Sequence, residues 1–286
     1  MLKKGYQDDE MARKSFNQLA GQIFGLDFES WYQNGYWRSN YIPYSIFKEN
    51  EVVANVSVSP MTFLKSGELN CYLQLGTVMT RKDCRNQGFI RQLIQEIQKD
   101  YEGKTDGWFL FANKHVLNLY PKFGFRRSDE FEYVKTVTID EEATARNVLL
   151  KEKTDFLKFQ NAIKKSCPQS SLWSVYNEEL TMFYALDYMR KNVYLISEQN
   201  AYVVASLKED TLYLHQVFSP EKVNLDRIAA AFGSGIKTLI LGFSPMDQYG
   251  FLCRKNPDND TVLYVKGESL NVIEREHLRI PELSHT

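Results

Sequence analysis

Hydrophobic and polar residues alternate with two different periods along the chain, and the changes of period predict the elements. Apolar residues at helical spacing indicate two short opening helices within residues 16–37. From residue 44 the period falls to two, which predicts a hairpin over 44–64 and a further strand over 71–80. A helix with one apolar face follows over 89–101, and the apolar run 107–113 is typical of a strand buried on both faces. This strand, helix and strand form one right-handed parallel crossover.

The rest of the chain repeats this order of elements. The first half closes with a short helix over 115–124 and an alternating strand over 131–139. The connection 140–165 is charged and contains no Pro or Gly, which favours a packed helix over a flexible linker. A helix, three strands, a helix capped by Asn224 and two more strands follow, the last over 262–267. We interpret the second half as a diverged copy of the first.

The repeated pattern predicts an α/β protein with mixed α+β sheets. Two tandem domains are expected, residues 1–140 and residues 141–286. Each is expected to hold a mostly antiparallel mixed sheet that contains one parallel pair of strands and is flanked by helices.

Composition restricts the classes of function. The chain has 286 residues, of which 43% are hydrophobic and 25% charged, as in ordinary globular proteins. Thirty-five Lys and Arg against 36 Asp and Glu leave a net charge of -1, which argues against an extended nucleic-acid surface or a polybasic membrane patch. Four scattered cysteines without a CxxC pattern indicate neither a disulfide framework nor a metal site. Because no apolar leader or spanning segment is apparent, we expect a cytoplasmic protein.

The segment 85–90, RNQGFI, lies between a predicted strand and a predicted helix. A helix N-terminus presents unpaired N–H groups and the positive end of the helix dipole, so it binds phosphate readily. Gly88 leaves the backbone open to close approach, and Arg85 and Arg91 can add charge-assisted contacts. The same residues also suit a tight turn with solvated arginines, so the segment alone leaves both interpretations open.

Three elements in order resemble the GNAT superfamily of acyl-CoA-dependent N-acyltransferases. Its pyrophosphate loop reads Arg/Gln-x-x-Gly-x-Gly/Ala after the fourth strand, and Arg85 and Gly88 match it. The strand end 78–80 precedes this loop, and the stretch 120–125, YPKFGF, follows at the distance the family expects. Ile90 stands where a small residue is common, and in this it is similar to the tandem-domain branch that includes the enhanced-intracellular-survival acetyltransferases.

The resemblance covers about residues 45–139 and implies a site for acetyl-CoA as acyl donor. In the family, two parallel strands splay apart, the pantetheine arm lies against the freed main chain, and a bulge leaves an N–H group near the thioester carbonyl. Gly76 suits such a distortion, and it also suits a simple irregularity of the sheet. Asn113 is either a pantetheine contact or a helix cap. The implied cofactor-binding residues are Val78, Met79, Thr80, Arg85, Asn86, Gln87, Gly88, Phe89, Ile90, Arg91 and Asn113.

The resemblance also implies that Tyr120 is the general acid, because the family carries a tyrosine just before its Gly-Phe corner. A phenol with a pKa of about 10 can protonate a leaving thiolate whose conjugate acid has a pKa of about 8.5. The general base is left open, since Gln74 stands where some relatives carry a glutamate, and water, Glu68 or a carboxylate of the second half are candidates. His115 suits an exposed helix cap better than a base, and His215 suits a packed or paired core position.

The second half carries SPEKVNLDRI, with Glu221 and no glycine, at the place equivalent to the loop. An acidic side chain repels pyrophosphate, so this half is expected to bind no CoA and to wall the acceptor cleft.

The function expected is an N-acetyltransferase that moves acetyl from acetyl-CoA to a primary amine of a small molecule or peptide by direct attack in a ternary complex. No nucleic acid, membrane or metal is expected, and the oligomeric state is left open. The alternative is a non-catalytic acyl-CoA-binding or interaction module. A third possibility, an aminoacyl-tRNA donor, is disfavoured by the near-neutral charge.

Overall fold

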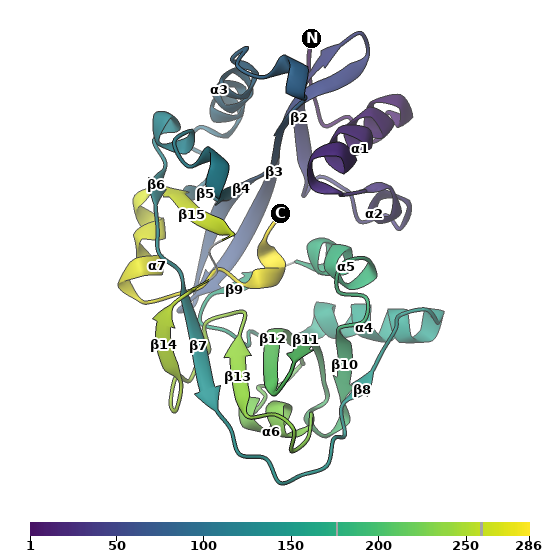
Figure 1. Cartoon of the computed structure of the whole chain (residues 1–286), viewed down its shortest axis with the longest axis vertical. Helices are drawn as coiled ribbons and strands as arrows, with labels where there is room; N and C mark the ends of the chain where they lie inside the picture. Colours follow the sequence, from purple (N-terminus) through teal and green to yellow (C-terminus); the bar gives the residue numbers. More distant parts are fainter. Residues whose placement is uncertain (176, 258–259) are drawn as a thin grey trace.

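The computed structural model describes residues 1–175, 177–257 and 260–286, and within these ranges the chain forms two β-sheets with helices around them (Figure 1). The strands of the first sheet are β1 (Leu2–Lys4), β2 (Ile42–Lys48), β3 (Glu51–Lys65), β4 (Glu68–Thr80), β5 (Gly107–Asn113), β6 (Arg126–Arg127), β9 (Trp173–Val175) and β15 (Thr261–Lys266). Those of the second sheet are β7 (Phe131–Thr136), β8 (Arg146–Asn147), β10 (Val193–Ile196), β11 (Ala201–Lys208), β12 (Thr211–Phe218), β13 (Thr238–Leu241) and β14 (Leu252–Lys255).

Helices flank both sheets. The α-helices are α1 (Glu10–Phe24), α2 (Glu29–Gln33), α3 (Phe89–Tyr101), α4 (Lys153–Lys165), α5 (Glu178–Leu186), α6 (Leu225–Ala230) and α7 (Val272–Arg275). Short 3₁₀ turns are η1 (Lys82–Cys84), η2 (Lys114–Val116), η3 (Tyr120–Phe123), η4 (Ser197–Gln199), η5 (Glu268–Asn271) and η6 (Glu282–Ser284). No helix in the described ranges combines the length and apolarity needed to cross a bilayer.

Each sheet is mixed, with one parallel pair among antiparallel neighbours. The first sheet has the order β1-β2-β3-β4-β5-β15-β6, with β9 also paired to β3, and β4 and β5 are parallel. The second has the order β14-β7-β13-β12-β11-β10-β8, and β12 and β13 are parallel. The predicted α/β class with two mixed sheets is therefore confirmed.

The two halves exchange strands: the first sheet contains β9 and β15 from the second half, and the second sheet contains β7 from the first half. β15, from the second half, pairs with β5 from Thr261↔Asn113 to Lys266↔Trp108 and also with β6. β7, from the first half, pairs with β13 and β14 in the second sheet. In Figure 1 the yellow-green β15 accordingly lies beside the blue-teal strands, and the teal β7 beside the green ones.

This exchange corrects the sequence-based assignment of the last strand of each half. Residues 131–139 were expected to close the first sheet and 262–267 the second, and both expectations are wrong. Alternation of apolar and polar residues identifies a strand and its buried face. Because the backbone hydrogen bonds of a sheet edge can form with any strand, this alternation does not indicate which strand pairs with which edge. A division into 1–140 and 141–286 stays a prediction, and a cut there would separate β15 from its sheet.

The helix expected over 140–165 is also shorter than predicted, because it begins at Lys153. The preceding stretch crosses the end of the second sheet in an extended form. The amides of Thr144 and Ala145 both donate to the carbonyl of Ala231 at the end of α6, at 2.9 and 2.8 Å. These tertiary bonds outweigh the helix propensity of the charged sequence.

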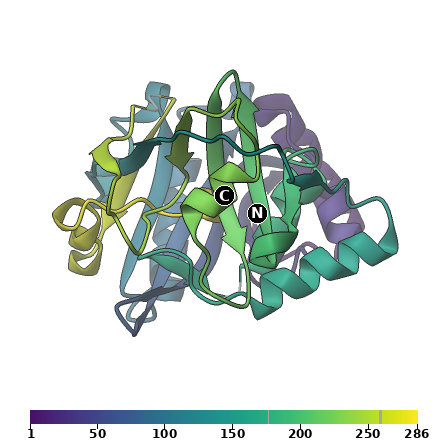
Figure 2. The same cartoon turned by 90° about the horizontal axis from the view of Figure 1, so that it is seen from below.

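The opening helices cover a core that both halves share. Phe16, Phe28 and Trp31 belong to the same buried cluster as Phe159 of α4 and Met182 of α5. The indole N–H of Trp31 also donates to the carbonyl of Glu179 at 2.7 Å. Figure 2 shows α4 beside the N-terminal helices at one side of the molecule. The aromatic residues of the N-terminal segment thus join the two halves.

Residues 279–286, which we call the strap, pass from the second sheet to the first. The amide of Glu282 donates to the carbonyl of Gly242 at the end of β13, at 2.9 Å. At the other end, the ring of His285 stacks on Phe111 of β5 with centroids 3.7 Å apart. The strap therefore contacts both sheets near the ends of their parallel pairs (Figure 1).

A part-buried hydrogen-bonded pair, His215 and Glu282, fixes the strap to the second sheet. His215 Nδ1 donates to the carboxylate of Glu282 at 2.8 Å, and His215 Nε2 shares a 2.7 Å hydrogen bond with the hydroxyl of Ser206. Burial by itself would raise the pKa of Glu282, but the hydrogen bond and charge of His215, with the charges of Arg279 and His285, outweigh it and lower the pKa to about 2. The interpretation of His215 as a packed, paired residue is confirmed.

This pair predicts a loss of stability in acid. Because the pKa of Glu282 is lower in the folded chain than its ordinary value of 4.5, its stabilising contribution is present above that pH and is lost as the pH falls toward about 2. We expect the wild-type melting temperature to fall between about pH 5 and pH 3, and Glu282→Gln to melt lower at pH 7 with a flatter profile. Differential scanning calorimetry across this range measures both.

The matched control is Glu198→Gln, because Glu198 is exposed and no ion pair is formed by it within the described residues. Its melting profile should follow that of the wild type. A Glu282→Gln profile as steep as the wild-type profile would contradict the assignment.

Candidate active site

The parallel pair β4/β5 separates halfway along its length. Leu75 and Leu110 are the last paired residues. Beyond them β4 pairs only with β3, and β5 only with β15. The main-chain groups on the two facing edges thus lack a strand partner, and an extended ligand arm can bind there by adding as a strand.

A bulge distorts β4 at this separation. Ser57 of β3 faces Gly76, while Asn55 faces Met79, so β4 carries one extra residue between these partners. Thr77 takes up the distortion with a positive φ of 45°. Gly76 has a different reason to lack a side chain, because a Cβ there would lie 2.5 Å from the hydroxyl of Thr286. The distortion that Gly76 suits is therefore present, together with a close approach of the strap.

A buried polar network holds the bulge in place. The hydroxyl of Ser45 pairs with that of Tyr6 at 2.6 Å and donates to the amide oxygen of Asn55 at 2.7 Å. The amide nitrogen of Asn55 donates to the carbonyl of Thr77 and to the hydroxyl of Ser57, both at 2.9 Å. Ser45, Asn55 and Ser57 are fully buried. Sequence analysis did not assign any role to these residues.

We expect Asn55→Leu to reduce the free energy of unfolding by about 2–3 kcal/mol, because it leaves the buried carbonyl of Thr77 without its donor. Denaturant unfolding measures this effect. Asn70→Leu, on the half-buried part of the same β3/β4 hairpin, is the control. Equal stability losses in the two variants would contradict this role of Asn55.

The loop before α3 is shaped to leave the helix N-terminus open. Arg81 anchors its start through ion pairs with Glu51 and Asp83, both at 2.8 Å. Gly88 has a positive φ of 78° at the N-cap, and no side chain caps the helix. A Cβ added to Gly88 would meet nothing within 4 Å, so the first amides of α3 face open space.

Positive charge surrounds this helix end. Arg85 and Arg91 are exposed, and within the described ranges neither forms an ion pair. The helix dipole adds partial positive charge at the same end. The arrangement suits an anion such as a pyrophosphate.

Tyr120 lies on the α3 side of the first sheet, near the separation of β4 and β5. Its ring is 5.7 Å from that of Tyr264 on β15, and Tyr264 faces Leu110, the last paired residue of β5. Burial raises the pKa of Tyr120 to about 12, with a smaller contribution from Tyr264. In the described part of the chain its hydroxyl has no hydrogen-bond partner, so the proton is free to be donated.

Residues 12–125, which include this separation and this loop, match the acetyltransferase (GNAT) family. This segment is therefore similar to the GNAT acetyltransferases. Members of the family typically use acyl-CoA. The resemblance drawn from Arg85, Gly88 and the YPKFGF stretch is thereby confirmed.

Solved structures show the same fold over nearly the whole chain. A conserved protein of unknown function from Enterococcus faecalis V583, described as a probable N-acyltransferase, is 14% identical and has a TM-score of 0.58, covering 99% of this chain and 72% of its own. A GCN5-related N-acetyltransferase from Kribbella flavida is 16% identical with a TM-score of 0.56, covering 93% and 70%. Eis1 from Mycobacterium abscessus is 13% identical with a TM-score of 0.50, covering 92% and 73%. The comparison with curated proteins finds no match.

The cofactor-binding residues expected from the sequence fall into two groups in the structure. The main chain of Val78, Met79 and Thr80 runs along the free edge of β4, and residues 85–91 form the loop and the first turn of α3. Asn113 ends β5 on the other side of the separation; it is exposed, and its side chain does not cap η2. These positions surround one path from the α3 N-terminus to the bulge.

The candidate bases lie in different places. Gln74 is fully buried and binds the strap, its amide accepting from the Thr286 N–H at 2.9 Å and donating to the carbonyl of Ser284 at 2.8 Å. Glu68 begins β4 eight residues before Gly76, which places it about 26 Å away along the strand. His115 is exposed on η2. None of the three is well placed to accept a proton at the bulge.

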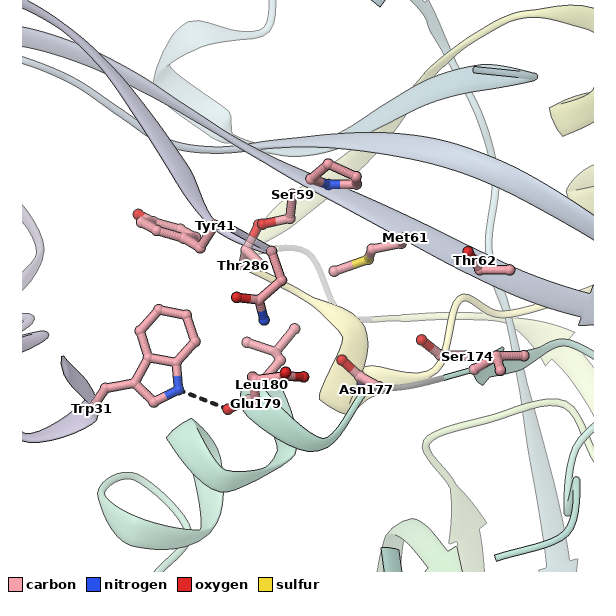
Figure 3. Close-up of a pocket in the computed structure, with 13 residues that line it drawn as sticks. Trp31, Tyr41, Ser59, Met61, Thr62, Ser174, Asn177, Glu179, Leu180 and Thr286 are labelled. Atoms are coloured by element: carbon pink, nitrogen blue, oxygen red, sulfur yellow. Dashed lines mark hydrogen bonds between the residues drawn. The ribbon is translucent and has the colours of Figure 1, made fainter. Parts of the chain in front are cut away.

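Two cavities lie on the strap side of the bulge, with volumes of about 240 and 280 Å³. Both are lined by Trp31, Tyr41, Leu180 and Thr286. In Figure 3, which shows the smaller cavity, Trp31 and Tyr41 stand on one side and Thr62 and Ser174 on the other. Sequence analysis did not identify these residues, because they come from four separate segments.

The equivalent site of the second half is closed. After Leu214↔Leu241, the amide of Gly242 still donates to the carbonyl of Leu214 at 2.8 Å, and Glu282 occupies the space beside Gly242. The side chain of Asn224 accepts from the first amides of α6, which removes these donors.

Proposed function

We propose that this chain transfers acetyl from acetyl-CoA to a primary amine by direct attack within a ternary complex. One observation carries the proposal: the open N-terminus of α3 and the separated edges of β4 and β5 form one continuous path in the family-matched segment. A pyrophosphate at one end and an extended arm along the strand edge fit this path.

The chain's own groups supply the binding contacts. The open amides of Gly88 to Arg91 donate to phosphate oxygens, and Arg85 and Arg91 add charge. The freed main chain of Val78 and Met79 pairs with the arm and positions the thioester at the bulge. An N–H group of the bulge then faces the thioester oxygen and stabilises the charge that develops there.

Tyr120 completes the reaction as the general acid. Its pKa of about 12 keeps the hydroxyl protonated at neutral pH. As the C–S bond breaks, this proton passes to the departing sulfur. The second half, on this proposal, binds no CoA and instead forms a wall of the acceptor side. Three features support this: the acidic Glu221, the occupied space beside Gly242 and the capped N-terminus of α6.

A non-catalytic acyl-CoA-binding module is the second candidate, and Gln74 favours it. Its amide cannot act as a base, and it is already bonded to the strap. Release of free thiol from acetyl-CoA in the presence of an amine distinguishes an enzyme from this module.

Thermal unfolding with and without acetyl-CoA tests the proposed binding site. A ligand at about 100 times its Kd adds about 2.7 kcal/mol, so the wild-type melting temperature should rise by several degrees. Gly88→Glu should abolish the shift by placing a carboxylate where the phosphates bind.

Gly103→Glu is the matched control. Gly103 also has a positive φ, and a Cβ there also meets nothing within 4 Å, but it lies beyond the C-terminus of α3. It should suffer the same backbone strain and keep the acetyl-CoA shift. No shift in the wild type would leave the likeness to acetyltransferases as one of fold alone.

A further inference from the structure

The larger of the two cavities, which we call the aromatic cavity, has an apolar lining. Its volume is about 280 Å³, and its wall includes Phe28, Trp31, Tyr41, Phe183, Tyr184 and Tyr188. Three of these rings pack on one another: Phe183 stacks on Phe28 at 5.3 Å and meets Trp31 edge-on at 5.6 Å. The wall is therefore preformed.

The aromatic cavity reaches the bulge of β4. Thr77, the strained bulge residue, lines the cavity together with His285 and Thr286 of the strap. The hydroxyls of Thr77 and Tyr41 share a hydrogen bond of 2.5 Å, which fixes this end of the wall. A molecule held in the cavity thus has one end at the place where the proposed function puts the thioester.

The side chains that line the two cavities carry little negative charge. Among the described residues, no Asp or Glu lines the aromatic cavity, and Glu179 is the one carboxylate that lines the smaller cavity. A polyamine or aminoglycoside needs several acidic partners, because each unpaired ammonium group loses its hydration on entry.

We infer that the acceptor is a monoamine with a compact apolar or aromatic body. The inference rests on the proposed function and names its substrate class. The body occupies the aromatic cavity, and the amine lies at Thr77 and Thr286.

The same environment prepares the amine for attack. Transfer into an apolar cavity disfavours the ammonium form and lowers the pKa of the amine from about 10, so one proton leaves to water without a strong base. The nitrogen lone pair then forms the N–C bond to the thioester carbon, the C–S bond breaks, and the second N–H proton leaves to water. The sulfur takes its proton from Tyr120, which regains one from water. No other reactant is needed.

Initial rates with acetyl-CoA and two amines test this inference. We expect kcat/KM for 2-phenylethylamine to exceed that for spermidine by about 100-fold or more. Phe183→Ala should lower kcat/KM for 2-phenylethylamine about tenfold and leave the acetyl-CoA melting shift unchanged. Phe156→Ala is the control, since Phe156 is a partly buried ring on the same core cluster outside the cavity.

The outcomes separate the inference from the proposed function. Faster turnover of spermidine, or no effect of Phe183→Ala on 2-phenylethylamine, overturns the inference while the acetyl-CoA shift still supports the function. A marked preference for octanoyl-CoA over acetyl-CoA also overturns it, because the cavity then holds the acyl chain of the donor. Absence of the acetyl-CoA shift removes the proposed function and the inference with it.

Discussion

Replacing Tyr120 by Phe is expected to lower kcat for acetyl transfer by about 100-fold or more and to leave the acetyl-CoA melting shift unchanged. The substitution removes one hydroxyl that has no partner in the described structure, so packing against Tyr264 and Phe125 is retained. What is lost is the proton for the leaving sulfur. Thiol release under saturating amine and acetyl-CoA measures the effect.

Tyr264→Phe is the control for this variant. Tyr264 is a buried neighbour whose hydroxyl donates to the carbonyl of Leu117 at 2.9 Å, so its loss should affect stability more than turnover. The pH profile adds a second criterion. Because burial raises the pKa of Tyr120 to about 12, the group stays protonated across the usual range, and kcat should not fall on its account below about pH 11. A Tyr120→Phe variant with wild-type kcat would remove Tyr120 from the mechanism.

A fragment of residues 1–140 is expected not to reach the native fold when produced alone. It lacks β15, which covers the whole edge of β5 and contributes the buried Leu263 and Val265 to the core. It also keeps β7, whose buried Tyr133 then has no sheet to join. The exposed strand edge and apolar surface should make the fragment aggregate.

Hydrogen exchange and size-exclusion chromatography measure this result. Co-production with residues 141–286 should restore a soluble complex, because each fragment then supplies the strand that the other lacks. A protected, monomeric 1–140 fragment would contradict the expectation and show that the first sheet is stable without the exchange.

The local parts of the site could be predicted from the sequence, because short-range signals specify them. The strand, the loop with Gly88 and the apolar face of α3 are adjacent in sequence, and their order identified the family. Each exchanged strand could pair with a nearby edge in its own half or with a similar edge more than 100 residues away, and it pairs with the distant one. No residue type within β7 or β15 indicates which of the two edges the strand pairs with.

The sequence of β3 contains a pattern that indicates the buried polar network. Asn55, Ser57 and Ser59 alternate with the apolar residues of β3, and all three are buried. A row of small uncharged residues differs from the Lys and Glu that usually face water, and this indicates a covered face. No comparable pattern indicates the strap. Glu282 and Thr286 make their contacts only in the folded structure, where the two sheets lie close together.

The strand exchange has a consequence for synthesis on the ribosome. β5 ends at Asn113 and its partner β15 begins at Thr261, so at about 5–20 residues per second the edge of β5 waits about 7–30 s for its neighbour. During this interval the nascent chain displays an apolar strand edge, which is the kind of surface that chaperones bind. The acceptor side is completed still later, when Thr286 emerges. A partly translated chain that still lacks β15 and the strap thus has no finished site.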